Sequence, residues 1–149
     1  MLRATFLLIA IALNSGHLAQ ASDLQSKLGA VHFPTSGSMK VQHHFIRGIA
    51  ALHSFWYTEA LKAFEQSIAI DPDFAMGYWG LAMAHNHPLW EDQEKKSAKE
   101  ALAKISGSSK LTQRERDYIH AARLLFGDEE KRMRDKAYSR AMKNIYHKY

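Results

Sequence analysis

The sequence predicts an all-α protein, and three observations support this class. The 149 residues include only three Pro and eight Gly, which leaves little room for long turns or many strands. Ala, Lys, Leu, Glu and Met, which favour helix, are plentiful. Apolar residues recur every three or four positions after about residue 40, which is the spacing of an amphipathic helix. The length suits one domain, and 46% hydrophobic with 23% charged residues is ordinary for a globular one.

Residues 1–21 have the three parts of a secretory signal peptide. Met1-Leu2-Arg3 is a short basic region, residues 4–13 are uncharged and mostly apolar, and Ala19-Gln20-Ala21 has the form of a cleavage site. A buried N-terminal helix is the alternative, but such helices seldom begin with this layout. The apolar run is too short to span ~30 Å of hydrocarbon comfortably, so we expect no stable membrane insertion after cleavage. The sequence therefore predicts an exported protein, periplasmic or secreted.

The charge of the remaining chain is unevenly distributed. Residues 22–92 carry four Lys or Arg against seven Asp or Glu, whereas residues 93–149 carry fifteen against eight. A basic half can indicate nucleic-acid binding. Here the basic side chains recur at helical spacing opposite an apolar stripe, which is typical of a solvated helix face. Together with the predicted export, this spacing argues against a nucleic-acid partner.

An N-terminal arm, residues 22–40, is expected to lead into the helices. It contains HFPTSGS (residues 32–38), whose Pro, Gly and hydroxyl residues are typical of a turn or loop. The first helix is then indicated by apolar residues three and four positions apart, namely Phe45, Ile49, Leu52 and Phe55 or Trp56. The second helix begins at about Trp56. It ends at Asp71-Pro72, because proline disfavours helix in the residue before it and cannot donate to the preceding turn.

The next two helices are also bounded by helix-breaking residues. The third is expected from about Phe74 to His87, where Pro88 ends it. The fourth is expected over about residues 94–105, and Gly107-Ser108-Ser109 follows as a C-terminal stop.

The last two helices have one clear start signal. Thr112-x-x-Glu115 predicts a capping box that opens the fifth helix, which Gly127 closes. The sixth helix is expected over roughly residues 129–147. Six helices joined by short loops then suggest an internal repeat.

A repeat of 34 residues is visible when Phe45 is set against Trp79. FIRGIAALHS then aligns with WGLAMAHNHP, and the first unit continues with Ala60-x-x-x-Phe64 and Pro72. The period of 34 residues and the pattern of these residues resemble those of the tetratricopeptide repeat superfamily. The combination of HFPTSGS, LHSFWYTEALKAF and DPDFAMGYWGLAMAHNHPLW also resembles a group of exported bacterial proteins with these repeats, for which we know of no activity.

The resemblance implies a tetratricopeptide-type α-solenoid of about three helical hairpins after a cleaved signal peptide. Its units would be residues 41–74, 75–110 and 111–149, with the match strongest in the first and weakest in the third. The second unit is longer than the first, and HNHPLWEDQE is where its extra residues are expected.

The resemblance also implies a concave groove lined by the first helix of each pair, and such grooves bind protein or peptide partners. The positions that face the groove are Gln42, Phe45, Ile49, Leu52 and His53 in the first unit and Met76, Trp79, Met83, Asn86 and His87 in the second. The superfamily's carboxylate clamp needs Lys and Asn where this chain has Phe45 and Ile49. A clamp for a chain terminus is therefore not expected. An alternative is that the aromatic residues seal the first two units against each other and against the arm.

Nine His and no Cys raise the alternative of a copper-type metal-binding protein of the periplasm. His85 and His87 are two apart, which on a helix points them about 200° apart. His53 and His87 are the better pair, because they are equivalent in successive units, and Met76 or Met83 could add soft ligands. No set of acidic residues accompanies these histidines as further metal ligands. The primary prediction therefore includes neither a metal nor another cofactor.

No motif indicates catalysis. The chain contains no G-x-S-x-G, no H-E-x-x-H and no glycine-rich phosphate loop, and His53-Ser54 is adjacency in sequence without a nucleophile–base geometry. We therefore expect no catalytic residues and no enzyme. The sequence predicts an exported scaffold that binds a peptide or protein partner in an apolar and aromatic groove.

The end of the sixth helix, NIYHKY, has neither a Gly nor a Pro stop. Met142, Ile145, Tyr146 and Tyr149 are expected to be partly uncovered there. Two explanations compete, which are a longer repeat array and self-association through this helix.

The signal-peptide prediction can be tested directly. Protein recovered after export should begin at Ser22, because Ala19 and Ala21 supply the small side chains that signal peptidase requires. Intact-mass measurement of the exported protein checks this. A mass that includes Met1 would contradict it.

Overall fold

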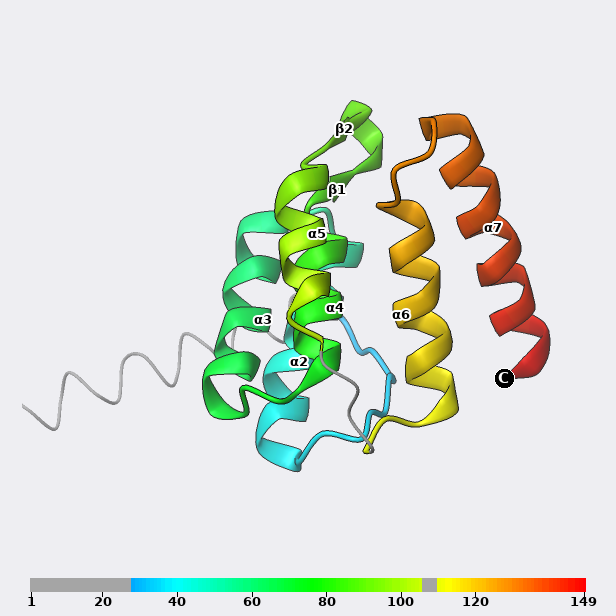
Figure 1. Cartoon of the computed structure of the whole chain (residues 1–149). Coiled ribbons are helices and arrows are strands. Elements are labelled where there is room, and N and C mark those ends of the chain that lie inside the picture. Colours follow the sequence, from blue (N-terminus) through cyan, green and yellow to red (C-terminus); the bar gives the residue numbers. More distant parts are fainter. Residues whose placement is uncertain (1–27, 106–109) are drawn as a thin grey trace, which may run out of the picture. The chain divides into compact units, whose positions relative to one another are not determined.

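The computed structural model describes residues 28–105 and 110–149 of the chain. The expected signal peptide and the Gly107-Ser108-Ser109 stop lie outside these residues. The described residues are mostly helical, which confirms the all-α class. Their α-helices, shown in Figure 1, are α2 (Met39–His53), α3 (Tyr57–Ile70), α4 (Ala75–Ala84), α5 (Lys95–Ala103), α6 (Gln113–Leu125) and α7 (Lys131–Lys148).

Consecutive helices pack against one another within one compact unit, Val31–Tyr149. The contacts are most extensive between α2 and α3 and between α6 and α7, followed by α3 with α4 and α4 with α5. Helix α4 also packs against α2 and α6, so it has the most neighbours among the described helices. Its sequence, AMGYWGLAMA, is apolar on every side, as expected for a helix surrounded by protein.

Two of the expected helix ends are confirmed. Helix α3 ends at Ile70, directly before Asp71-Pro72. Helix α6 begins with the expected capping box, in which the Thr112 side chain accepts from the Glu115 N–H and the Glu115 side chain accepts from the Thr112 N–H. These reciprocal bonds satisfy two backbone donors that the first turn of a helix leaves without partners.

The expected end of the third helix is wrong by three residues. Helix α4 stops at Ala84, and residues 86–93 form a small antiparallel hairpin from β1 (Asn86–His87), a 3-10 turn η1 (Pro88–Trp90) and β2 (Asp92–Gln93). Proline at 88 disfavours helical geometry in the residue before it, so His87 is extended, and pairing with β2 supplies its hydrogen bonds. This hairpin lies within HNHPLWEDQE, residues 85–94.

The end of α7 is partly uncovered, as expected, at three of the four residues named: Met142 is half-buried, and Tyr146 and Tyr149 are exposed. Ile145, by contrast, is buried. The Asp117 carboxylate of α6 accepts hydrogen bonds from Lys148 Nζ at 2.8 Å and from the Tyr149 hydroxyl at 3.0 Å. The bond from Lys148 is the main cause that lowers the pKa of Asp117 below its usual range. The last turn of α7 is therefore tied to α6.

Phe64 of α3 fills the point where α2, α3 and α4 meet. Its side chain is fully buried between Gly48 of α2 and Gly80 of α4. A Cβ atom added at Gly48 would lie 2.5 Å from the Phe64 ring, and one added at Gly80 would lie closer still. Both added Cβ atoms would overlap the Cδ1 and Cε1 atoms of the ring, so neither position accepts a side chain unless the ring shifts.

Substitution Gly80→Ala should therefore lower the free energy of unfolding by about 1–3 kcal/mol, because overpacking outweighs the gain of ~1 kcal/mol in helix propensity. Urea denaturation measures this. The control is Gly127→Ala, whose new Cβ would lie 3.4 Å from the Arg123 and Leu124 carbonyl oxygens. It should change stability by less than about 1 kcal/mol. Equal effects of the two substitutions would contradict the packing described for Phe64.

Candidate partner-binding groove

The arm before α2 is an extended strand of chain that lies against the helices. Side chains alternate along it: Val31, Phe33, Thr35 and Gly37 are half-buried, whereas His32, Pro34, Ser36 and Ser38 are exposed. This period of two is the one expected of an extended backbone with one face against the protein. In Figure 1 the arm is the blue segment that leads into α2. We use the term arm groove for the surface that holds residues 31–37.

Phe33 is the main apolar contact of the arm. Its ring centroid lies 5.5 Å from that of Phe45 on α2, 5.9 Å from that of Trp79 on α4 and 5.1 Å from that of Tyr118 on α6. The guanidinium of Arg114 lies 4.8 Å from the same ring, in the geometry of a cation–π contact. The ring is therefore enclosed by one aromatic residue from each of three helices and covered by a cation.

Gln42 binds the backbone of the arm. Its Nε2 donates to the Phe33 carbonyl oxygen at 2.6 Å, and its Oε1 accepts from the Thr35 hydroxyl at 2.5 Å. One amide side chain thus satisfies two arm residues that are two positions apart. This is how a side chain can replace a neighbouring strand for an extended segment.

Glu115 binds the arm and caps α6 at once. Its Oε1 accepts from the Ser36 N–H at 2.7 Å and from the Ser36 hydroxyl at 2.9 Å. Its Oε2 accepts from the Thr112 N–H at 2.7 Å and from the Thr112 hydroxyl at 2.8 Å. The residue is only 2% exposed, so these four donors replace the water that a carboxylate needs.

Gly37 lies at a point of the arm where the neighbouring side chains leave no room for a Cβ atom. A Cβ atom there would lie 2.5 Å from Phe74 and 2.5 Å from Val41. The backbone of the arm therefore approaches the side chains of the fold directly at this position.

The structure divides the groove residues expected from the sequence into two sets. Phe45, Ile49, Met76 and Trp79 are buried, and Phe33 of the arm contacts Phe45 and Trp79. The remaining residues are half-buried or, for His53, exposed, and they are Gln42, Leu52, His53, Met83, Asn86 and His87.

One alternative from the sequence was that the aromatic residues pack against the arm, as Trp79 does against Phe33, whereas the contribution of α6 was not expected. Phe33, Arg114, Glu115 and Tyr118 were not among the expected groove residues. The alternation of apolar or small with polar residues in VHFPTSGS was the available signal, because it has the period of an extended, half-buried segment.

Tyr118 of the arm groove also has a neighbour on α7, the phenol of Tyr138. Burial raises the pKa of the Tyr138 phenol, and Tyr118 adds to the shift.

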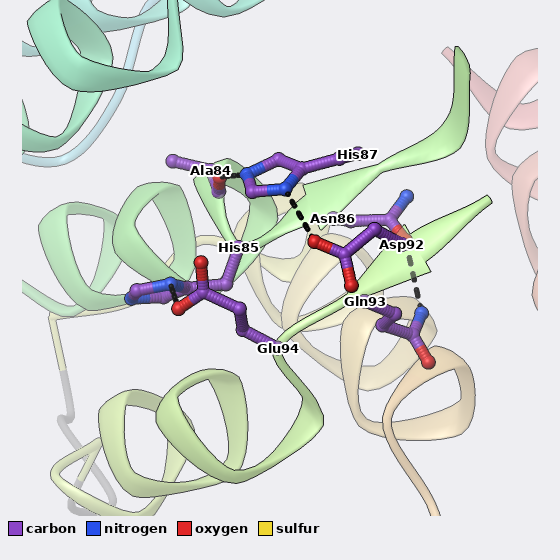
Figure 2. Close-up of polar contacts among 7 residues, drawn as sticks. All are labelled: Ala84, His85, Asn86, His87, Asp92, Gln93 and Glu94. Atoms are coloured by element: carbon purple, nitrogen blue, oxygen red, sulfur yellow. Dashed lines mark hydrogen bonds and ion pairs between the residues drawn. The ribbon is translucent and has the colours of Figure 1, made fainter. Parts of the chain in front are cut away.

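The hairpin after α4 holds Asn86 and His87, the last two expected groove residues. Figure 2 shows its side chains paired across the strands: Asn86 with Gln93 at 2.9 Å and His87 Nδ1 with Asp92 Oδ2 at 3.2 Å. The same figure shows His85 Nδ1 beside Glu94 Oε2, at 3.0 Å.

These pairs stabilise the hairpin by cross-strand contacts, which short strands need. The His87 ring also lies on Tyr57, with 4.3 Å between centroids, and burial raises the pKa of that tyrosine. The hairpin is thereby fastened to the start of α3.

The metal alternative gains no support from this geometry. His87 Nδ1 lies beside Asp92, and His87 Nε2 lies 3.0 Å from the Ala84 carbonyl oxygen, so oxygen atoms of the chain face both nitrogens. His53 is exposed at the end of α2. Over residues 28–105 and 110–149, no group of three or more His, Asp or Glu side chains is placed to hold a metal ion.

Comparisons with known proteins assign no class to the chain. No family model, curated protein or solved structure matches it. Among the described helices, none is long and apolar enough to cross a membrane. The functional argument therefore rests on the geometry of the arm groove.

Substitution Glu115→Ala should lower the free energy of unfolding by about 1–2 kcal/mol, because it removes half of the capping box of α6 and the hydrogen bonds to Ser36. The Ser36 amide should also exchange its proton faster. Urea denaturation and hydrogen exchange measure the two effects. Glu100→Ala, at an exposed position of α5, is the matched control and should stay within about 0.5 kcal/mol. An unchanged Ser36 exchange rate in the Glu115 variant would show that the carboxylate does not hold the arm.

Proposed function

We propose that this chain is an exported scaffold that binds an extended segment of a partner protein in the arm groove. The observation that carries the proposal is the way the groove holds residues 31–37 of its own chain. Alternate side chains of this segment face the groove, and its backbone is bound by the side chains of Gln42 and Glu115.

These are the features by which proteins recognise extended peptides. Bonds to the backbone supply binding that tolerates different sequences, and pockets for alternate side chains supply specificity. The arm groove has both, and its contacts come from helices, which hold their side chains more rigidly than loops do.

The helical pairs support a solenoid of tetratricopeptide type. The aromatic residues around Phe33 come from α2, α4 and α6, the first helix of each successive pair. That is where the resemblance to this repeat family places a concave binding face. The N-terminal segment, with its basic start and its cleavage site, supports export.

In this proposal the arm and the partner compete for one groove. A tethered segment is present at an effective concentration on the order of millimolar, so a free peptide competes poorly with it. Weakening the arm should therefore uncover binding. Phe33→Ala removes the ring that three helices enclose and leaves the length of the chain unchanged.

The test is selection of a random peptide library displayed on phage against the full chain carrying Phe33→Ala. We expect enrichment of binding peptides at least about tenfold above that on the unsubstituted chain, because the arm no longer fills the groove. His32→Ala, one residue earlier and exposed, is the control and should behave as the unsubstituted chain.

Circular dichroism and urea denaturation establish that each variant is folded. Ser36→Glu is a second way to weaken the arm, because it sets a carboxylate against that of Glu115. If both arm variants are folded and neither enriches any peptide, the proposed function is wrong.

A further inference from the structure

We propose that the partner segment has the five-residue pattern aromatic, any residue, hydroxyl residue, hydroxyl residue, glycine. This inference rests on the proposed function, and it names the class of ligand. The pattern is that of Phe33-Pro34-Thr35-Ser36-Gly37, and four of its five positions follow from a contact in the arm groove.

The first position requires a planar ring. The space occupied by Phe33 is bounded by the rings of Phe45, Trp79 and Tyr118, and Arg114 lies over its face. Aromatic pairs with centroids 4.5–7 Å apart, and a cation over the ring, add attraction that an aliphatic side chain does not receive.

The second position is open to many residues. Pro34 is exposed, and its side chain has no aromatic or ionic contact among those that hold the arm. Proline also has no N–H to donate, so recognition at this position does not require one.

Both hydroxyl positions satisfy acceptors of the groove. Gln42 donates through Nε2 to the carbonyl oxygen of the first position, which turns its Oε1 toward the third position, where the Thr35 hydroxyl donates. At the fourth position both the N–H and the hydroxyl of Ser36 donate to Glu115 Oε1. Proline at the fourth position would lack the N–H, and an acidic residue would be repelled by Glu115.

Glycine at the fifth position follows from sterics alone. Any side chain would begin with a Cβ atom 2.5 Å from Phe74 and Val41, which is closer than carbon atoms approach in proteins. The arm groove therefore rejects a bulkier residue at this point by overlap.

The experiment uses a fluorescent peptide of the sequence VHFPTSGS, residues 31–38, and the full chain carrying Phe33→Ala. Fluorescence anisotropy measures the dissociation constant. We expect saturable binding by this variant and at least about tenfold weaker binding by the unsubstituted chain, whose own arm competes.

Four altered peptides test the pattern. Phe33→Ala, Ser36→Glu and Gly37→Ala in the peptide should each weaken binding about tenfold or more, whereas Pro34→Ala should change it by less than about threefold. The last peptide is the matched control, since it has the same length and loses an exposed side chain.

Three results would overturn the inference, and they are distinguishable from one another. If the library yields tight peptides that lack the pattern and VHFPTSGS does not bind, the pattern is wrong while the proposed function stands. If no peptide of any sequence binds either arm variant, the proposed function fails as well. If the unsubstituted chain sediments as a dimer that Phe33→Ala abolishes, the occupant is the arm of a second copy and not a separate partner.

Discussion

The contact of the Phe33 ring with Phe45, Trp79 and Tyr118 is the interaction on which the rest of the site depends. It joins the arm to aromatic residues from three helices, α2, α4 and α6. Helix α4 packs against α2, α3 and α6. Phe64 fits between α2 and α4 because Gly48 and Gly80 have no side chains there. The fold therefore places a continuous aromatic surface where an extended segment can bind.

The two carboxylate oxygens of Glu115 have different partners, one in the helix cap and one in the arm. Its Oε2 caps α6 through Thr112, while its Oε1 binds Ser36 of the arm. If the arm leaves, the cap remains and Glu115 Oε1 loses the two donors of Ser36. A segment that supplies an N–H and a hydroxyl at this point would restore both bonds.

Much of the fold could be predicted from the sequence, because its signals are local. Asp71-Pro72 and the Thr112–Glu115 capping box mark helix ends through contacts within a few residues, and both were interpreted correctly. The third helix was extended too far because Pro88 was taken as its end, whereas the chain leaves the helix after Ala84. The pairing of His87 with Asp92 that replaces the last turn involves strands of only two residues, which leave no alternating pattern in the sequence. Phe45 and Trp79 were expected in the groove, and packing of Trp79 against the arm was one alternative, but the contact of Tyr118 on α6 with Phe33 was not expected. The hydrogen bonds between Ser36 and Glu115 join residues 79 positions apart, and no local pattern indicates such a pairing.

The most direct test of the account is nuclear magnetic resonance of the isotope-labelled chain with and without unlabelled VHFPTSGS peptide. In the free chain we predict nuclear Overhauser contacts from the Phe33 ring to the rings of Trp79 and Tyr118, whose centroids lie 5.9 and 5.1 Å away. In the chain carrying Phe33→Ala, whose arm competes less, saturating peptide should give contacts from the peptide's own phenylalanine to the same two rings. A folded unsubstituted chain that shows no contact between Phe33 and these rings would contradict the account, as would a folded Phe33→Ala chain in which excess peptide gives no such contact.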